Sequence, residues 1–267
     1  MKNLVTACLL GLTTLSAAAQ TAPVFSSTCD DRSRTSGNTS KTYCEIRDLT
    51  LASPGSQTLT IDGGANGGIT VKGWDGSDVR VRANVTSWGQ TEAAASQQAR
   101  SISIATTGNT LRAAGPDQSG PGWAVSYEVF VPRRTALALT TINGGISLSN
   151  LDSRVRFEAV NGGVSLTGVS GQIKGHTTNG GLSIRLTGTK WEGEGLDVET
   201  TNGGITWELP KNYSAKLFTS TNMGSIAANL PVTKSGFTHK EIATSLGQGG
   251  ASVRAVTTNG GIRVKQE

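Results

Sequence analysis

A phrase that ends in Asn-Gly-Gly recurs along this chain of 267 residues and constrains its fold more than any other feature. From Asn143 to Asn179 the copies are 18 residues apart, and the later intervals are 23, 20 and 37 residues. A recurring period of this length is typical of repeat proteins, in which each unit buries its apolar face against its neighbours. The anchors of the repeat are Asn66, Asn143, Asn161, Asn179, Asn202, Asn222 in the degenerate copy Thr221-Asn222-Met223-Gly224, and Asn259.

Apolar and polar residues alternate after each anchor. Ile146 and Leu148 flank Ser147, and the next two periods repeat this pattern from Val164 and from Leu182. Alternation with a period of two is typical of a half-buried strand. Each period therefore predicts short strands that pair in parallel with the next coil, about 4.8 Å away. We expect an all-β fold, a right-handed single-stranded parallel β-solenoid that is similar to a β-helix.

An antiparallel meander is the alternative, because Asn-Gly between strands is also typical of a hairpin turn. The 18-residue period favours stacked coils, since sandwiches and barrels space their strands by about 8–12 residues. In stacked coils we expect the Asn-Gly-Gly corner at positive φ, where these residues are best tolerated, and an amide ladder between its asparagines. The 37-residue interval spans about two periods, and residues 245–250 are expected to form its unmarked turn.

Residues 87–140 fit the period less well and predict an irregular N-terminal part. Long helices are not expected, because the chain holds 35 glycines and each costs ~1 kcal/mol relative to alanine inside a helix. One short helix is predicted after Thr91, a residue type that caps helices, and would cover one end of the rod. A hairpin over 101–112 and an alternating strand over 124–132 follow.

The first 19 residues are typical of an export signal. They combine a charged start, an apolar run and small residues that predict cleavage near Ala19. The apolar run is shorter than the ~20 residues that a membrane span requires, and no later segment qualifies. We therefore expect an exported protein, located in the periplasm, at the cell surface or outside the cell, with no transmembrane segment in the mature chain.

Cleavage would remove Cys8 and leave Cys29 and Cys44. Two cysteines in an oxidising compartment predict a disulfide, which would pin an N-terminal segment over residues 20–48. A redox-active pair is the alternative, but it lacks the two-residue spacing typical of such sites. Residues 49–267 are expected to form the solenoid.

Charge and motifs exclude several classes of function. The net charge is +5, yet no stretch gathers five basic residues, so a nucleic-acid partner is not expected. The chain has two histidines, His176 and His239, and no phosphate loop, nucleophile elbow or paired-histidine motif. No catalytic residue, metal site or cofactor is therefore predicted.

One insertion is a candidate ligand site. It contains Trp191, Glu192 and Glu194, where the repeat lengthens from 18 to 23 residues. A tryptophan can stack on a sugar ring, and glycosidases use paired carboxylates. The alternative is a solvated loop beside an alternating strand.

Three features together resemble a known bacterial family. They are Ile69-Thr70-Val71-Lys72-Gly73-Trp74-Asp75-Gly76, the strand over 127–132, and the Asn-Gly-Gly coils that follow it. From about Leu49 onward the chain is similar to the domain-of-unknown-function family labelled "putative adhesin". The resemblance implies an export signal, a Gly-rich single-stranded β-solenoid and no catalytic residues. The family's coils often carry Asp in place of the second glycine, and this chain departs from that pattern.

These observations predict an exported, non-enzymatic β-solenoid of unknown specific role. Adhesin-like binding to a glycan or to the cell envelope is the leading hypothesis. A carbohydrate-active enzyme that uses the insertion from Trp191 to Glu199 is one alternative. A self-assembly or scaffold module is another, because unpaired strand edges invite partners.

Overall fold

The computed structural model describes residues 22–29, 40–116, 122–230 and 240–267. The predicted signal segment, Met1 to Ala19, and His239 lie outside the described residues. Among the described helices, none has the length and apolar character needed to cross a membrane.

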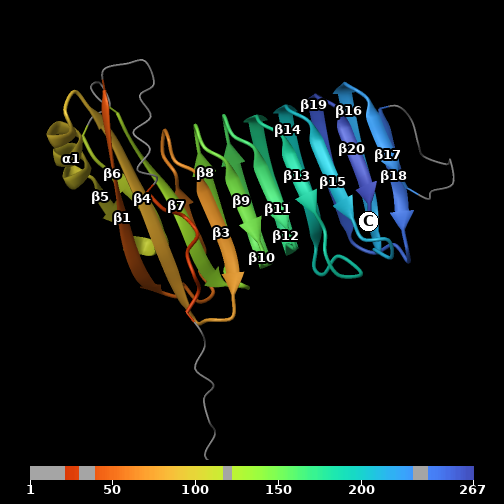
Figure 1. Ribbon diagram of the computed structural model, residues 1–267. Helices are drawn as coiled ribbons and strands as arrows, with labels where there is room; N and C mark the ends of the chain where they lie inside the picture. Colours follow the sequence, from red (N-terminus) through yellow and green to blue (C-terminus); the bar gives the residue numbers. More distant parts are fainter. Residues whose placement is uncertain (1–21, 30–39, 117–121, 231–239) are drawn as a thin grey trace, which may run out of the picture.

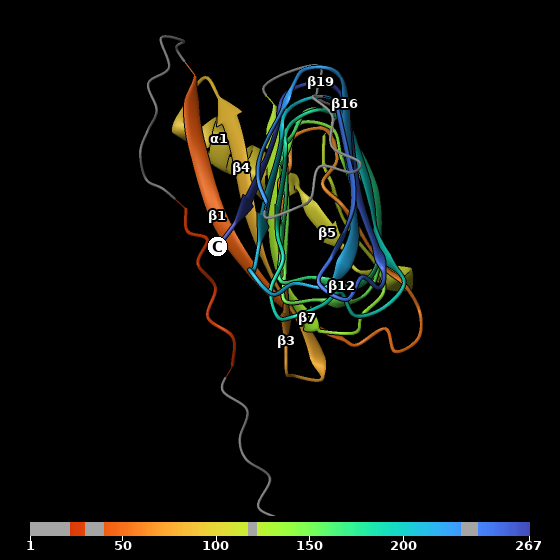
Figure 2. The same ribbon diagram turned by 90° about the vertical axis from the view of Figure 1, so that its right-hand side faces the viewer.

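Two ten-stranded sheets face each other along the rod (Figure 1), which confirms the all-β prediction. Viewed end-on, the chain traces flattened loops with one sheet on each side (Figure 2). In spatial order, the first sheet contains β1 (Lys41–Ala52), β4 (Asp78–Gly89), β7 (Trp123–Pro132), β3 (Ile69–Trp74), β9 (Ile146–Ser149), β11 (Val164–Thr167), β13 (Leu182–Arg185), β15 (Ile205–Leu209), β20 (Ile262–Gln266) and β17 (Ile226–Asn229). The second sheet contains β18 (Glu241–Leu246), β16 (Ala215–Met223), β19 (Ser252–Asn259), β14 (Gly195–Asn202), β12 (Ser170–Asn179), β10 (Asp152–Ala159), β8 (Leu137–Thr141), β2 (Leu59–Asp62), β6 (Thr110–Ala114) and β5 (Ser103–Ala105).

The regular coils pair in parallel. Val164 lies opposite Ile146 on one side and Leu182 on the other, so the equivalent positions of three periods stand in one row. Each Asn-Gly-Gly step joins a strand of the second sheet to a strand of the first, so the hairpin alternative is wrong at these steps. The apolar rows face inward between the sheets, and Trp207, which lies opposite Ile184, is fully buried in one of them.

The order of the coils differs from the order of the sequence at the C-terminal end. The last coil, β19 and β20, lies between the coil of β14 and β15 and the coil of β16 and β17. Sequence order would place it at the end of the rod. The prediction that residues 245–250 add a stacked coil is also wrong, because β18 pairs antiparallel with β16.

A similar exchange occurs at the N-terminal end. The coil of β2 and β3 lies between the coil of β6 and β7 and the coil of β8 and β9. Beyond it β7, β4 and β1 pair antiparallel. Helix α1 (Glu92–Ser101) packs on β4 and β1, and the Thr91 hydroxyl accepts a hydrogen bond of 3.1 Å from the Ala94 amide. The predicted helix and its cap are therefore confirmed, and Figure 1 shows the helix at one end of the rod. A one-turn 3₁₀ helix (Thr107–Asn109) lies between β5 and β6, which form the predicted hairpin.

The Asn-Gly-Gly corner is not a site of positive φ, which corrects the reason that we expected for its glycines. In these coils positive φ occurs at the opposite bend, at Asn150 (55°) and Gly168 (58°). A Cβ at Gly162 would instead lie 2.0 Å from the carbonyl oxygen of Gly144 in the neighbouring coil. The first glycine is therefore required because two backbones approach each other closely at this corner.

Two ladders of side chains run along the same corner. The side-chain amide of each corner asparagine donates to the side-chain oxygen of the one before it, over 2.7 to 3.1 Å, in the order Asn66, Asn143, Asn161, Asn179, Asn202 and Asn259. Buried threonine hydroxyls donate, over 2.6 to 2.8 Å, to the carbonyl of the first corner glycine in the neighbouring coil, from Thr141, Thr177, Thr200, Thr257 and Thr221. Ala159 occupies the equivalent position in one coil and interrupts the threonine ladder.

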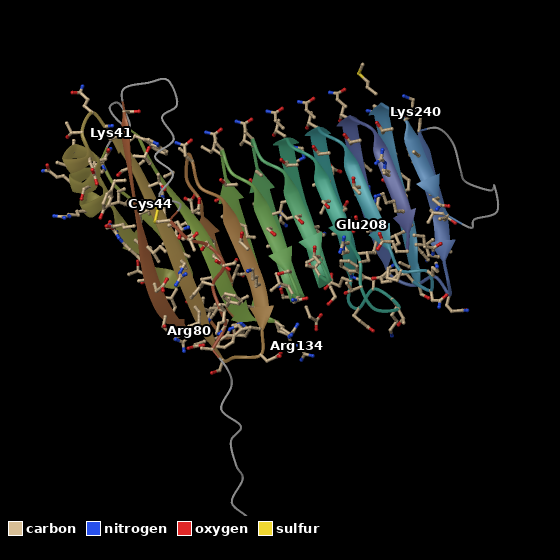
Figure 3. All side chains as sticks on the ribbon, viewed as in Figure 1. Lys41, Cys44, Arg80, Arg134, Glu208 and Lys240 are labelled. Carbon is tan, nitrogen blue, oxygen red and sulfur yellow. A yellow bond between two sulfur atoms is a disulfide. The ribbon has the colours of Figure 1, made fainter. Side chains whose placement is uncertain are left out.

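The degenerate copy does not continue the asparagine ladder. Met223 lies opposite Asn259, so Asn222 stands one position earlier than the corner and is not a ladder residue. The Met223 side chain is exposed. Nearby, the Lys240 ammonium donates to the carbonyls of Asn222 and Gly224, over 2.9 and 2.8 Å, where the row of corners ends (Figure 3).

Candidate functional site

The insertion before β14 does not expose its tryptophan as the predicted ligand site requires. Trp191 is only 4% exposed, and its indole nitrogen donates a hydrogen bond of 3.1 Å to the carbonyl of Gly171. The ring therefore fills the interior and has no free face for stacking on a sugar. The prediction of Trp191 as a ligand-binding residue is wrong, because an aromatic side chain next to an apolar core gains more from burial than from exposure.

The two carboxylates of the insertion are engaged separately. Glu192 lies 3.3 Å from the Lys190 ammonium, whereas Glu194 accepts a hydrogen bond from Gln172 of β12. Each carboxylate therefore has its own local partner, and Trp191 does not stand beside them as a platform. In the described part of the chain, no group of three or more His, Cys, Asp and Glu residues could hold a metal ion.

An N-terminal strap, residues 22–29, crosses the outer face of the first sheet and covers Glu128 of β7. The Glu128 carboxylate is 3% exposed and accepts hydrogen bonds from the backbone amides of Ser26 and Ser27, the latter at 2.7 Å. It also forms an ion pair of 2.7 Å with the Lys72 ammonium of β3. Burial alone would raise the pKa of Glu128, but hydrogen bonds from Lys72, Ser27 and Ser26 outweigh it and lower the pKa to about 2.

Aromatic contacts and the disulfide also hold the strap. The Phe25 ring packs edge-on against Phe130 at 5.3 Å, and the Arg82 guanidinium lies 4.6 Å from the centre of the Phe25 ring. The predicted disulfide joins Cys29 at the end of the strap to Cys44 of β1 (Figure 3). Sequence reasoning did not single out Glu128, because Glu128 occupies an outward position in an alternating strand and only the strap makes it buried.

The outer face of the first sheet carries a row of hydroxyl groups beyond the strap. The strand registers place Thr70, Ser147, Ser165, Ser183 and Thr206 on successive strands. A hollow of about 630 Å³ runs along this row and is lined by these side chains and by the second glycines of the corners. The hollow is therefore uncharged, and Ile146, Val164 and Leu182 also line it.

The outer face of the second sheet is charged. Arg254 of β19 forms ion pairs with Asp197 (2.6 Å) and Glu199 (2.8 Å) of β14 and lies 5.9 Å from the centre of the Phe218 ring. Burial lowers the pKa of Arg254, but the hydrogen bonds that Arg254 donates to Glu199 and Asp197 outweigh it, so the net shift is upward. His176 of β12 lies beside this group, 3.5 Å from the Thr201 hydroxyl, and is a polar residue of the outer wall.

Three cations of the same face have no such partner among the described residues. Arg154 and Arg156 of β10 and Lys174 of β12 are exposed, and no described carboxylate lies within ion-pair distance of them. The second sheet therefore has a neutralised part at β14 and β19 and an open basic part at β10 and β12.

These features define a repeat protein of two facing β-sheets, which presents side chains in register on both outer faces. The chain belongs to the Toastrack DUF4097 family, whose profile matches residues 69–265. This family is a domain of unknown function and agrees with the resemblance drawn from the sequence. No match was found among curated proteins.

Several solved structures are similar to the chain at low identity. A "putative cell adhesion protein" from Clostridium sporogenes is 12% identical, with 84% of this chain and 100% of that chain covered and a TM-score of 0.47. A "putative adhesin" from Bacteroides fragilis is 11% identical, with 84% and 97% covered and a TM-score of 0.34. A "putative lipid binding protein" from Parabacteroides distasonis is 12% identical, with 83% and 97% covered and a TM-score of 0.34.

Proposed function

We propose that this protein is an exported, non-enzymatic binding module that presents the outer faces of its sheets to a glycan or to the cell envelope. The observation that carries the proposal is the rigid register of these faces. Close glycine corners and two hydrogen-bond ladders fix each coil against the next, so outward side chains stand in rows about 4.8 Å apart. A surface of this kind suits a long, repetitive ligand, because its contacts recur along the rod.

Export is part of the proposal. Residues 1–19 would be removed near Ala19, and the disulfide between Cys29 and Cys44 agrees with an oxidising compartment. The mature protein would then consist of an N-terminal segment over 20–48 and a coil-forming domain over 49–267. N-terminal sequencing of protein recovered outside the cytoplasm tests this, and we expect the sequence to begin at Gln20.

We also propose that the coils wind as a right-handed single-stranded β-solenoid. The parallel registers in both sheets support this winding, and crossover connections between parallel strands are right-handed in about 98% of cases. The exchanged coils at both ends make the winding depart from sequence order.

A binding panel tests the function. The full chain would be assayed against peptidoglycan, neutral and acidic polysaccharides and extracellular matrix, with reducing-end release measured in the same samples. We expect saturable binding to at least one polymer and no release. Failure to bind every polymer at micromolar concentration would reject the proposal, and release of reducing ends would favour the enzyme alternative.

The edge of the first sheet favours self-assembly as a second candidate. Within the described strands β17 pairs only with β20, and an unpaired edge can accept another strand. Light scattering of the purified protein tests this candidate, and a monomer at all concentrations would exclude it.

A further inference from the structure

The open basic part of the second sheet has an arrangement that folding alone does not explain. The strand register places Arg156 directly opposite Lys174, and Arg154 stands two residues before Arg156 on the same face of β10. Like charges directly opposite each other on neighbouring strands are destabilising. The nearest acidic residue in register with Lys174 is Asp197, and Arg254 already pairs with Asp197.

A hollow lies beside these three cations. It has a volume of about 230 Å³ and contains Arg154, Arg156 and Lys174 in its wall, together with Gln172, Leu137 and Ala138. Ala138 of β8 is the register neighbour of Arg156, so a small side chain stands where a longer one would fill the space. The described residues that line this hollow include no carboxylate.

The hollow adjoins a second one of about 220 Å³ with a different lining. Arg156 and Lys174 border both, and the second also contains Glu158, His176 and the two carboxylates that pair with Arg254. A ligand with closely spaced negative charges would meet repulsion there. A polymer with one negative group per sugar and hydroxyl groups between fits both hollows. Its negative group would lie in the basic hollow, and its hydroxyl groups would form hydrogen bonds with the carboxylates and the imidazole of the second.

We propose that Arg154, Arg156 and Lys174 form a subsite for the carboxylate or sulfate group of an acidic polysaccharide. The hydroxyl groups of the same polysaccharide would form hydrogen bonds with Glu158 and His176. Charge-assisted hydrogen bonds from two guanidinium groups and an ammonium would hold the oxyanion and relieve the repulsion between the cations. This inference rests on the proposed binding function and names its ligand class.

Binding of three polymers by the full chain tests the subsite. Polygalacturonate supplies one carboxylate per sugar, a lightly sulfated dextran supplies well-separated sulfates, and dextran has neither. The variant Arg156→Gln/Lys174→Gln removes two charges from the subsite, and Arg263→Gln/Lys265→Gln removes two exposed charges from β20 of the first sheet as a matched control. Circular dichroism and thermal melting establish that both variants fold.

We expect the wild type to bind one of the two acidic polymers and to bind dextran more weakly. The subsite variant should bind the acidic polymer about tenfold more weakly, the loss expected for about one charge-assisted contact, and the control should change by less than about twofold. Added salt should weaken polymer binding by the wild type more than binding by the subsite variant. If the double variant does not fold, Arg154→Gln serves instead, with a loss of about threefold.

If both double variants bound the acidic polymer equally more weakly than wild type, the subsite would be overturned, since the net charge of the protein would then explain binding. A preference for duplex DNA or for vesicles of anionic lipid that depends on the same residues would also overturn it. Binding to peptidoglycan or dextran that neither variant alters would reject the subsite while leaving the proposed function intact. Failure to bind any polymer would reject both.

Discussion

The regular coils and the N-terminal region are stabilised in different ways. From β8 onward the coils pair largely in parallel, and the same few contacts repeat at each corner. The N-terminal region uses antiparallel strand pairs, together with a helix, a disulfide and a buried carboxylate that each occur once among the described residues. A repeated coil presents a complementary edge to its neighbour, but the end of a rod has no neighbour and needs its own covering.

The largest loss of stability is expected when a methyl group is added at the first glycine of an Asn-Gly-Gly corner. Gly162→Ala would place a Cβ 2.0 Å from the Gly144 carbonyl oxygen. Because that oxygen belongs to the backbone, the clash can be removed only by moving the backbone. We expect a loss of about 3 kcal/mol in the free energy of unfolding. Gly163→Ala is the matched control, because its Cβ would be 3.4 Å from the nearest atom, and it should stay within about 1 kcal/mol of wild type. Equal losses in denaturant titrations would contradict the close-approach explanation.

Low pH should reduce the stability of the N-terminal region, because Glu128 becomes protonated. Its pKa falls from an ordinary 4.5 to about 2 on folding, so its stabilisation is present above pH 4.5 and is lost as the pH falls toward 2. At ~1.4 kcal/mol per pKa unit, about 3 kcal/mol of the unfolding free energy should disappear over this range.

The variant Glu128→Gln isolates this effect. Its stability should lie below that of wild type at pH 7, and the difference should shrink as the pH approaches 2. Glu158→Gln, on the exposed face of β10, should retain the wild-type pH dependence. A wild-type pH profile in Glu128→Gln would show that the strap does not depend on this carboxylate.

Removal of the disulfide should separate the two regions. Cys29→Ser/Cys44→Ser opens a bridge with a sequence separation of 15, which contributes about 2–3 kcal/mol in the chain-entropy account. We expect faster hydrogen exchange in the strap and in β1, with β10 to β14 unchanged. Faster exchange throughout the coils would mean that the strap stabilises the whole rod.

The smallest effect concerns the gap in the threonine ladder. Ala159→Thr should add the missing hydrogen bond to the Gly144 carbonyl and raise stability by about 1 kcal/mol. Thr177→Val should lose a similar amount, because it removes the 2.8 Å bond to Gly162. Ala159→Val controls for added volume, and an equal gain there would assign the effect to packing.

Local features of this fold could be predicted from single segments. The alternation around Ile146, the cap at Thr91 and the bridge between Cys29 and Cys44 each depend on residue types and short spacings. The site was less predictable. Trp191 and Glu192 share an insertion, but burial of the indole separates their roles. Glu128 stands in an ordinary alternating strand, and only a segment about 100 residues away buries it.

The sequence by itself determined that the strands would alternate apolar and polar residues and that successive coils would stack. Backbone geometry within one strand dictates that alternation, so a local pattern suffices. Only the tertiary structure decided which coils are neighbours, why the first corner glycine is needed and which cations lack a partner. Near-identical coils offer near-identical edges, so contacts between distant segments, and not the repeat itself, select the final order.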